Sequence, residues 1–328
     1  MKTTFNTCGN GNLSVLLNIF RRLIPREAHI PTERILLPEV VEGGITLDIR
    51  REDLLHPLIS GNKFRKLKYN LVQAEKEGHD TLLSFGGAFS NHIAAVARAG
   101  KEFGFRTIGI IRGEELEANP QANPTLGRAI QDGMQLKFVS RKQYREKTES
   151  DFHVALYREY GRFYLLPEGG TNALAVKGCE EILKAEDERY DVICCSTATG
   201  GTLAGIINSS DNRQKVIGFP SLKADFIKKD ICSFVSKSNW YLEDGYHFGG
   251  YAKINETLVA FINNFHLVTG VPLDPVYTGK MFYGLLDMVR RKKFIPGTSI
   301  LAIHSGGLQG TEGMNRKLEQ KKLPLINL

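Results

Sequence analysis

Short apolar runs alternate with longer stretches of helical periodicity along most of the chain. The apolar runs are rich in β-branched residues, which favours strands buried in a parallel sheet. Strands are predicted at Thr81–Phe85, Thr107–Ile111, Leu136–Val139, Phe163–Leu166, Val192–Ser196, Val216–Phe219 and Ile300–Ile303. Helices are predicted at Asn91–Phe103, Thr125–Gln131 and Leu203–Asn208. Strands and helices in alternation are typical of βαβ units, so the sequence predicts an α/β protein built on parallel sheets.

Pairs of glycines follow several of the predicted strands. They are Gly86-Gly87, Gly169-Gly170, Gly200-Gly201 and Gly306-Gly307. In open parallel sheets, ligands bind outside the carboxyl ends of the strands, and the helices that follow offer free N–H groups to anions. The glycine pairs therefore predict a ligand site at these turns.

The length of 328 residues and an ordinary globular composition predict two domains. The formal net charge of +7 raises the question of a nucleic-acid partner. The densest basic runs are Arg290–Lys293, Lys228–Lys229 and Lys321–Lys322. These runs are short and lack interleaved aromatic residues, so we expect a solvated surface and no nucleic-acid partner.

Cysteine content and the N-terminal segment bear on the compartment. The five cysteines are odd in number and widely spread, which favours reduced thiols: Cys8, Cys179, Cys194, Cys195 and Cys232. The apolar run Leu16–Phe20 is short and is followed by two arginines, with no small-residue cleavage pattern. No apolar run approaches the roughly 20 residues that span a bilayer. A cytoplasmic protein without export signal or membrane anchor is expected.

Several familiar site motifs do not fit the chain. Gly9-x-Gly11 has no third glycine and no preceding strand, which argues against a nicotinamide site. The adjacent Cys194 and Cys195 do not have metal-ligand spacing, and the eight histidines are scattered, so no metal site is expected.

Three segments carry candidate catalytic or ligand-binding residues. In Ser60–Lys68, Asn62 is a predicted helix N-cap, and the following Lys63 sits at the positive end of the helix dipole, which favours its neutral, nucleophilic amine. In Phe85–His92, Ser90 is a predicted N-cap beside free amides that can bind a carboxylate. Ser196–Thr202 forms a strand, glycine turn and helix, which suits a bound monophosphate.

Taken together, these segments resemble the family of pyridoxal-phosphate enzymes that contains D-cysteine desulfhydrase and 1-aminocyclopropane-1-carboxylate (ACC) deaminase. Six motifs occur in the family order from about Arg51 to Gly310: S-G-N-K-F-R-K-L, F-G-G-A-F-S-N-H, P-E-G-G-T-N, T-G-G-T-x-A-G, D-P-V-Y-T-G-K and H-S-G-G-L-Q-G. The resemblance implies the two-domain fold type II, or tryptophan-synthase-β-like fold, with parallel sheets and helices on both faces. It implies pyridoxal 5'-phosphate as cofactor and a homodimer as assembly.

The resemblance also assigns roles by position. It implies Lys63, Ser90 and Tyr277 as catalytic residues, with Lys63 holding the cofactor. Ser90, Asn91, His92 and Tyr277 would bind the substrate, although for His92 a structural role that only extends the turn is the favoured alternative. The cofactor would contact Lys63, Asn91, Ala198, Thr199, Gly200, Gly201, Thr202, Thr278 and Ser305. Ala198 stands where the family more often has glycine, and Ser305 where threonine is more usual. Arg65 and Lys66 are expected to be local phosphate or surface charges.

The implied domains are residues 1–63 with 173–328, which bind the cofactor, and residues 64–172, a smaller α/β unit. ACC deaminases carry a glutamate directly after the active-site tyrosine, where this chain has Thr278. A hydroxyl cannot keep the ring nitrogen protonated, so we expect β-elimination of D-cysteine to pyruvate, ammonia and hydrogen sulfide. ACC deamination to 2-oxobutyrate and a noncatalytic binding protein of the same fold are the alternatives.

Overall fold

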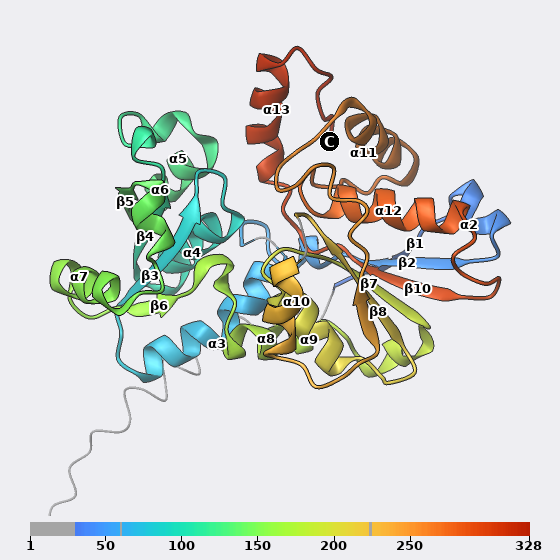
Figure 1. Ribbon diagram of the computed structural model, residues 1–328, viewed down its shortest axis with the longest axis horizontal. Helices are drawn as coiled ribbons and strands as arrows, with labels where there is room; N and C mark the ends of the chain where they lie inside the picture. The colour runs from blue at the N-terminus through green and yellow to red at the C-terminus, as the bar shows by residue number, and fades with distance from the viewer. Residues whose placement is uncertain (1–29, 60, 223–224) are drawn as a thin grey trace, which may run out of the picture.

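Two β-sheets organise the computed structural model, which describes residues 30–59, 61–222 and 225–328 (Figure 1). The larger sheet has the order β1 (Thr32–Arg34), β2 (Thr46–Arg50), β10 (Ser299–Ile303), β7 (Val192–Thr197), β8 (Lys215–Pro220) and β9 (Trp240–Leu242). Only β1 runs antiparallel to its neighbour in this sheet. The smaller sheet is fully parallel, in the order β5 (Met134–Val139), β4 (Arg106–Arg112), β3 (Thr81–Gly87) and β6 (Tyr164–Leu166).

Helices cover both faces of each sheet, because alternate strand residues enter different cores. In the smaller sheet, Leu82 packs with α3 (Asn62–Lys76), α4 (Asn91–Phe103) and α5 (Pro124–Gln131). Leu83 points to the opposite face, toward α6 (Arg141–Arg145) and α7 (Ser150–Tyr160). The predicted α/β fold with helices on both faces is confirmed.

The larger sheet is layered in the same way. One face packs against α2 (Pro38–Glu42), α11 (Glu256–Thr269), α12 (Thr278–Arg290) and α13 (Gly310–Gln320). The other packs against α8 (Ala173–Glu180), α9 (Gly201–Ser209) and α10 (Asp225–Cys232). The chain thus crosses from the larger sheet to the smaller one and back, as Figure 1 shows.

The predicted domain boundary between residues 63 and 64 falls just inside α3. That helix packs against α4 on the side of the smaller sheet and against α8 on the side of the larger one. The division into residues 1–63 with 173–328 and residues 64–172 stays a prediction. Gly9-x-Gly11, Cys8 and the run Leu16–Phe20 lie outside the described residues.

The start of α3 differs from its predicted form. Gly61, with φ of 42°, is the N-cap, and Asn62 is already helical. A Cβ at Gly61 would lie 2.2 Å from the Ser305 carbonyl oxygen, so the close passage of two backbones requires glycine there. The Asn62 amide donates to the Thr202 hydroxyl at 2.8 Å instead of capping the helix. The N-cap prediction for Asn62 was wrong because this tertiary contact claims the side chain.

Several expectations about surface and metal can be compared with the described residues. All residues of the three basic runs are exposed. Cys179, Cys194 and Cys195 are buried free thiols, and Cys232 is exposed. Over residues 30–59, 61–222 and 225–328, no helix is long and apolar enough to cross a membrane, and no cluster of potential metal ligands occurs.

Candidate active site

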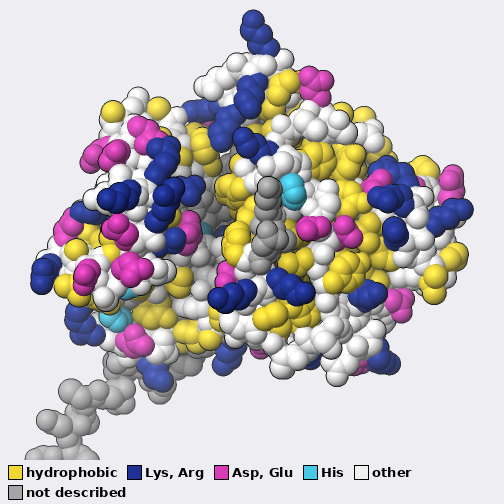
Figure 2. All heavy atoms as spheres, viewed as in Figure 1, with side chains coloured by type: hydrophobic (Ala, Val, Ile, Leu, Met, Phe, Trp, Pro, Cys, Tyr) yellow, Lys and Arg dark blue, Asp and Glu magenta, His cyan; other side chains and the backbone are white. Residues whose placement is uncertain are grey.

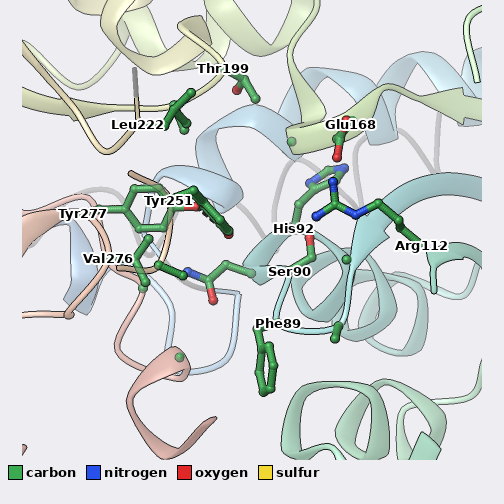
Figure 3. A pocket seen from close by; sticks show the side chains of 18 of the residues that line it. Phe89, Ser90, His92, Arg112, Glu168, Thr199, Leu222, Tyr251, Val276 and Tyr277 are labelled. Carbon is green, nitrogen blue, oxygen red and sulfur yellow. Dashed lines mark hydrogen bonds between the residues drawn. The ribbon is translucent and has the colours of Figure 1, made fainter. Parts of the chain in front are cut away.

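A cavity of about 960 Å³ opens between the two sheets, at the carboxyl ends of their strands. Figure 2 shows the hollow between the two lobes, and Figure 3 shows its walls from close by. Ten of the twelve predicted site residues line it: Lys63, Ser90, Asn91, His92, Ala198, Thr199, Gly200, Thr202, Tyr277 and Ser305. Gly201 and Thr278, both predicted to contact the cofactor, do not line it.

Lys63 projects from the first turn of α3 into this cavity. Burial, together with the nearby charge of Lys66, lowers the pKa of its ammonium to about 7. A large fraction of Lys63 is therefore neutral at neutral pH, and a neutral amine is the form that attacks a carbonyl carbon. The position suits a lysine that captures an aldehyde.

Lys66 lies one helical turn further along α3 and is buried, so of the two expected roles, a phosphate charge or a surface charge, the surface role does not hold. Its Nζ donates to the Gly169 carbonyl and the Thr171 hydroxyl, both at 3.0 Å, and to the Thr199 hydroxyl at 3.3 Å. A buried ammonium group next to Thr199 places positive charge at one end of the cavity. Arg65 is also buried, but it pairs with Glu52 rather than with this end of the site.

The turn from Ala198 into α9 forms a cradle of free amides at that end. Gly200 has φ of 77°, and among the described residues no acceptor is found for the N–H groups of Gly201 and Thr202. Free N–H groups at a helix N-terminus, with Lys66 beside them, are suited to a phosphate. The residues present therefore fit the phosphate and the aldehyde of pyridoxal phosphate.

The turn from β3 into α4 lies on the opposite wall. Ser90 is the N-cap, as predicted, and its hydroxyl accepts from the Ile93 N–H at 3.2 Å. Within the described part of the chain, the N–H groups of Asn91 and His92 have no acceptor. These two amides can hold a carboxylate, while the Ser90 hydroxyl remains able to donate to it.

Two tyrosines lie side by side on one wall of the cavity, at the left of Figure 3. The Tyr277 hydroxyl donates to the Tyr251 hydroxyl at 3.3 Å. Burial raises the pKa of Tyr277 well above its usual range, and the neighbouring Tyr251 adds to this effect, so Tyr277 stays protonated. Tyr251 was not predicted, because no motif marks the irregular loop between β9 and α11 that carries it.

Thr278 is fully buried at the start of α12, behind the cavity wall. Its hydroxyl donates to Asp274 Oδ1 at 2.7 Å and accepts from the Asp274 N–H at 2.9 Å. The hydroxyl nearest to Ser305 is that of Ser196, at 3.2 Å, and both serines line the cavity. Ser196 belongs to the segment predicted to bind a phosphate. Its place beside Ser305 follows only from the pairing of β7 with β10.

The architecture defines a class of protein. One parallel and one mostly parallel sheet, both flanked by helices, with a buried lysine and a phosphate cradle facing one cavity, form the fold type II of pyridoxal-phosphate enzymes. A solved structure described as an ACC deaminase homologue is similar, with a TM-score of 0.75 and 27% identity, over 93% of this chain and 98% of the other. A hydrogen sulfide-producing enzyme from Fusobacterium nucleatum, at 15% identity and a TM-score of 0.62, shares the fold.

The sequence comparisons narrow this class to one family. A protein of Pyrococcus horikoshii, provisionally named 1-aminocyclopropane-1-carboxylate deaminase, is 32% identical over 90% of this chain and 95% of its own. The bifunctional D-cysteine desulfhydrase/ACC deaminase of Arabidopsis thaliana is 30% identical over 86% of this chain and 78% of its own. A D-cysteine desulfhydrase of Klebsiella pneumoniae is 27% identical over 84% of this chain and 92% of its own. A search of family models found no match.

The chain belongs to the family of ACC deaminases and D-cysteine desulfhydrases, and it is an enzyme. The family resemblance drawn from the six motifs is confirmed. Which of the two reactions the chain catalyses is not decided by these relatives, because both names occur among them.

Proposed function

We propose that the chain is a pyridoxal-phosphate-dependent lyase that eliminates hydrogen sulfide from D-cysteine. The observation that carries the choice of reaction is the hydroxyl pair of Ser196 and Ser305, 3.2 Å apart at the ends of β7 and β10. Among the described residues that line the cavity, the only carboxylates are Glu115 and Glu168, and both belong to the segment of the smaller sheet. Asp274 lies behind the wall, where its carboxylate accepts from Thr278 and from the amides of residues 276–278.

By the family resemblance, Ser305 would lie beside the pyridine nitrogen of the cofactor. Hydroxyls beside that nitrogen support elimination over ring opening. The opening of ACC breaks a C–C bond without loss of a Cα proton, which asks more of the cofactor as an electron acceptor. A carboxylate at the ring nitrogen would strengthen that acceptor by keeping the nitrogen protonated, whereas neutral hydroxyls do not. Elimination from D-cysteine makes the smaller demand.

The residues divide the work as follows. Lys63 would hold the cofactor, and the amides and hydroxyl around Gly200–Thr202, with Lys66, would bind its phosphate. Bound pyridoxal phosphate would supply the group that accepts the electron pair released at Cα. Ser90 and the amides of Asn91 and His92 would hold the substrate carboxylate.

Proton transfer falls to Lys63 and Tyr277. Lys63 takes the Cα proton, because its lowered pKa leaves it able to act as a base. The Cβ–S bond breaks with its electron pair going to sulfur, and the protonated Tyr277 hydroxyl can stabilise the leaving thiolate by donating to it. Water converts the remaining 2-aminoacrylate to pyruvate and ammonia.

The test is a pair of assays on the cofactor-loaded protein. Pyruvate and sulfide are measured from D-cysteine, and 2-oxobutyrate from ACC, with L-cysteine as a stereochemical control. We expect the D-cysteine reaction to have the larger kcat/KM. A protein that forms 2-oxobutyrate but no sulfide would overturn the argument from Ser196 and Ser305, and a protein that cannot be loaded with the cofactor would overturn the enzyme mechanism.

A further inference from the structure

One arginine of the cavity wall has no role in the proposed reaction. Arg112 ends β4, directly opposite Gly87 of β3 in the parallel register. The guanidinium lies beside the turn that follows β3: a Cβ built at Gly87 would be 3.5 Å from Nη2 of Arg112, an ordinary contact distance. Figure 3 shows the side chain extended into the cavity beside His92 and Glu168.

Arg112 lies beside an aromatic ring and has no acidic partner among the described residues. Its guanidinium stacks 5.6 Å from the ring centroid of Tyr144, which is only 3% exposed. The two oxygens of Glu168 are engaged elsewhere, by the Tyr144 hydroxyl at 2.8 Å and by Lys147 at 3.3 Å. Among the described residues, no carboxylate lies within ion-pair distance of Arg112, and its exposed side chain lines the cavity with donors that no acidic side chain engages.

His92 provides a second, independent indication of a ligand in this corner. It is 2% exposed and lines the cavity, yet neither ring nitrogen has a hydrogen-bond partner among the described residues. Burial, with the charges of Lys63 and Lys66, holds the pKa of His92 well below its usual range, so the ring is neutral and can donate one hydrogen bond. A buried polar group without a partner is costly, and a bound ligand removes that cost.

The charge of the whole cavity points in the same direction. Among its described lining residues, nine are lysine or arginine and two are glutamate. Lys63 and Lys66 serve the cofactor end, and Glu115 and Glu168 already have basic partners in Arg141 and Lys147. The positive charge that remains exceeds what one substrate carboxylate needs. The volume of about 960 Å³ also stands at the upper end of small-molecule sites.

We propose that Arg112, with His92 beside it, forms a subsite for an acidic group on the substrate side chain. The preferred substrates would then be β-substituted D-amino acids whose substituent carries a carboxylate or a comparable anion. This inference rests on the proposed function and adds the substrate class to it. The chemistry is unchanged: Cα–H and Cβ–S break, sulfur leaves with the electron pair and takes up a proton, and water completes pyruvate and ammonia.

Two thioethers of equal size test the subsite. S-(2-carboxyethyl)-D-cysteine and S-(2-carbamoylethyl)-D-cysteine differ only in the charge at the end of the substituent, and each releases a thiol together with pyruvate. Hydrogen bonds to charged groups contribute about 1.5–3 kcal/mol, so we expect kcat/KM to favour the carboxylate by about 10- to 100-fold. In Arg112→Gln the ratio should fall to about 1 through a higher KM for the carboxylate.

Two further variants separate recognition from structure. Arg112→Lys keeps a charge without the planar fork and should retain part of the preference. Arg106→Gln is the matched control, because Arg106 sits at the other end of the same strand, exposed and paired with Asp80. It removes the same charge, and the ratio should stay at the unmodified value.

A binding measurement makes the inference independent of turnover. Both thioethers are titrated by calorimetry into cofactor-treated Lys63→Ala protein, with and without Arg112→Gln. With Arg112 present, the Kd of the carboxyethyl compound should be lower than that of the carbamoylethyl compound, and in Arg112→Gln the two Kd values should be equal. Pyruvate from both compounds at equal kcat/KM in the unmodified enzyme would overturn the subsite and leave the proposed function standing. An equal loss for both compounds in Arg112→Gln would assign Arg112 to the α-carboxylate instead. If neither compound nor D-cysteine yields pyruvate, the proposed function fails, and the calorimetric ratio alone decides the subsite.

Discussion

Individual side chains in this protein take their chemistry from where the chain buries them. Lys63 and Lys66 stand one helical turn apart on α3, and both have lowered pKa values because of burial. Lys66 has three oxygen acceptors, whereas Lys63 faces the open cavity. The same residue type therefore gives a hydrogen-bonded anchor at one position and a reactive amine at the other.

The pKa of Lys63 predicts how the cofactor-free protein captures pyridoxal phosphate. Only the neutral amine reacts, so the capture rate should rise about tenfold per pH unit below 7 and level off above it. Stopped-flow absorbance between pH 5.5 and 9.5 measures this rate. A rate that keeps rising through pH 9 would mean that Lys63 has an ordinary lysine pKa. Lys63→Ala, as control, should give no borohydride-reducible adduct.

At the scale of elements, a buried ion pair attaches α3 to the larger sheet. Arg65 donates to Glu52 through Nε at 3.0 Å and Nη2 at 3.1 Å, and both side chains are at most 2% exposed. Glu52 opens the short 3-10 helix that follows β2, so the pair holds the helix that carries Lys63 against the sheet.

Breaking this pair should be costly. Glu52→Gln removes the nearer carboxylate from the buried Arg65, which keeps Glu181 at 3.6 Å, and should lower the free energy of unfolding by about 3 kcal/mol, the lower end of the cost of breaking a buried pair. Asp80→Asn, which breaks the exposed pair with Arg106, should cost about 1 kcal/mol or less. Urea unfolding measures both. The double variant Glu52→Leu/Arg65→Met should recover part of the loss, and equal costs for Glu52→Gln and Asp80→Asn would contradict a structural role for the pair.

A second buried lysine holds the loop that carries Tyr251. From α12, Lys280 Nζ donates to the carbonyls of His247 and Gly250, both at 2.8 Å, and of Ser221 at 3.4 Å. The loop needs this support, because Phe248 and Ala252 both have positive φ.

Lys280→Met should leave these carbonyls without a donor and lower the free energy of unfolding by roughly 2–3 kcal/mol. It should also lower kcat, because Tyr251 would no longer be held against Tyr277. Thermal unfolding and D-cysteine assays measure the two effects. Lys293→Met, at an exposed position after the same helix, is the control and should change neither. An unchanged kcat in Lys280→Met would show that the loop with Tyr251 keeps its position without Lys280.

Across the whole molecule, the two lobes enclose a cavity with a large excess of positive charge. A field of this kind attracts anionic ligands, and salt screens it over a Debye length of about 10 Å at 0.1 M. For the carboxyethyl thioether, kcat/KM should therefore fall several-fold between 20 and 200 mM KCl. The carbamoylethyl compound serves as the control and should respond less, and identical salt slopes for the two would argue against a net attraction at the cavity.

Much of the architecture was readable from local pattern. The predicted helix Asn91–Phe103 matches α4 at both ends, and each predicted strand overlaps an observed one. The N-cap of Ser90 was also predicted correctly, since its acceptor role depends only on residues three positions away. Strands β1, β2 and β9 were missed. Strands β1 and β9 have three residues each at the edges of the sheet and carry too little pattern to stand out, whereas β2 is a five-residue interior strand.

The sequence alone determined the fold class, the family and ten of the residues that meet in the cavity, because glycine turns and strand periodicity are local signals and six ordered motifs carry the family. The tertiary structure decided what each side chain faces. It paired Asn62 with Thr202, committed Thr278 to Asp274, placed Ser196 beside Ser305 and left Arg112 open to the cavity. These contacts join residues far apart in the chain or depend on the exact packing of a helix end. Local sequence patterns reveal neither, because both depend on how distant segments pack in three dimensions.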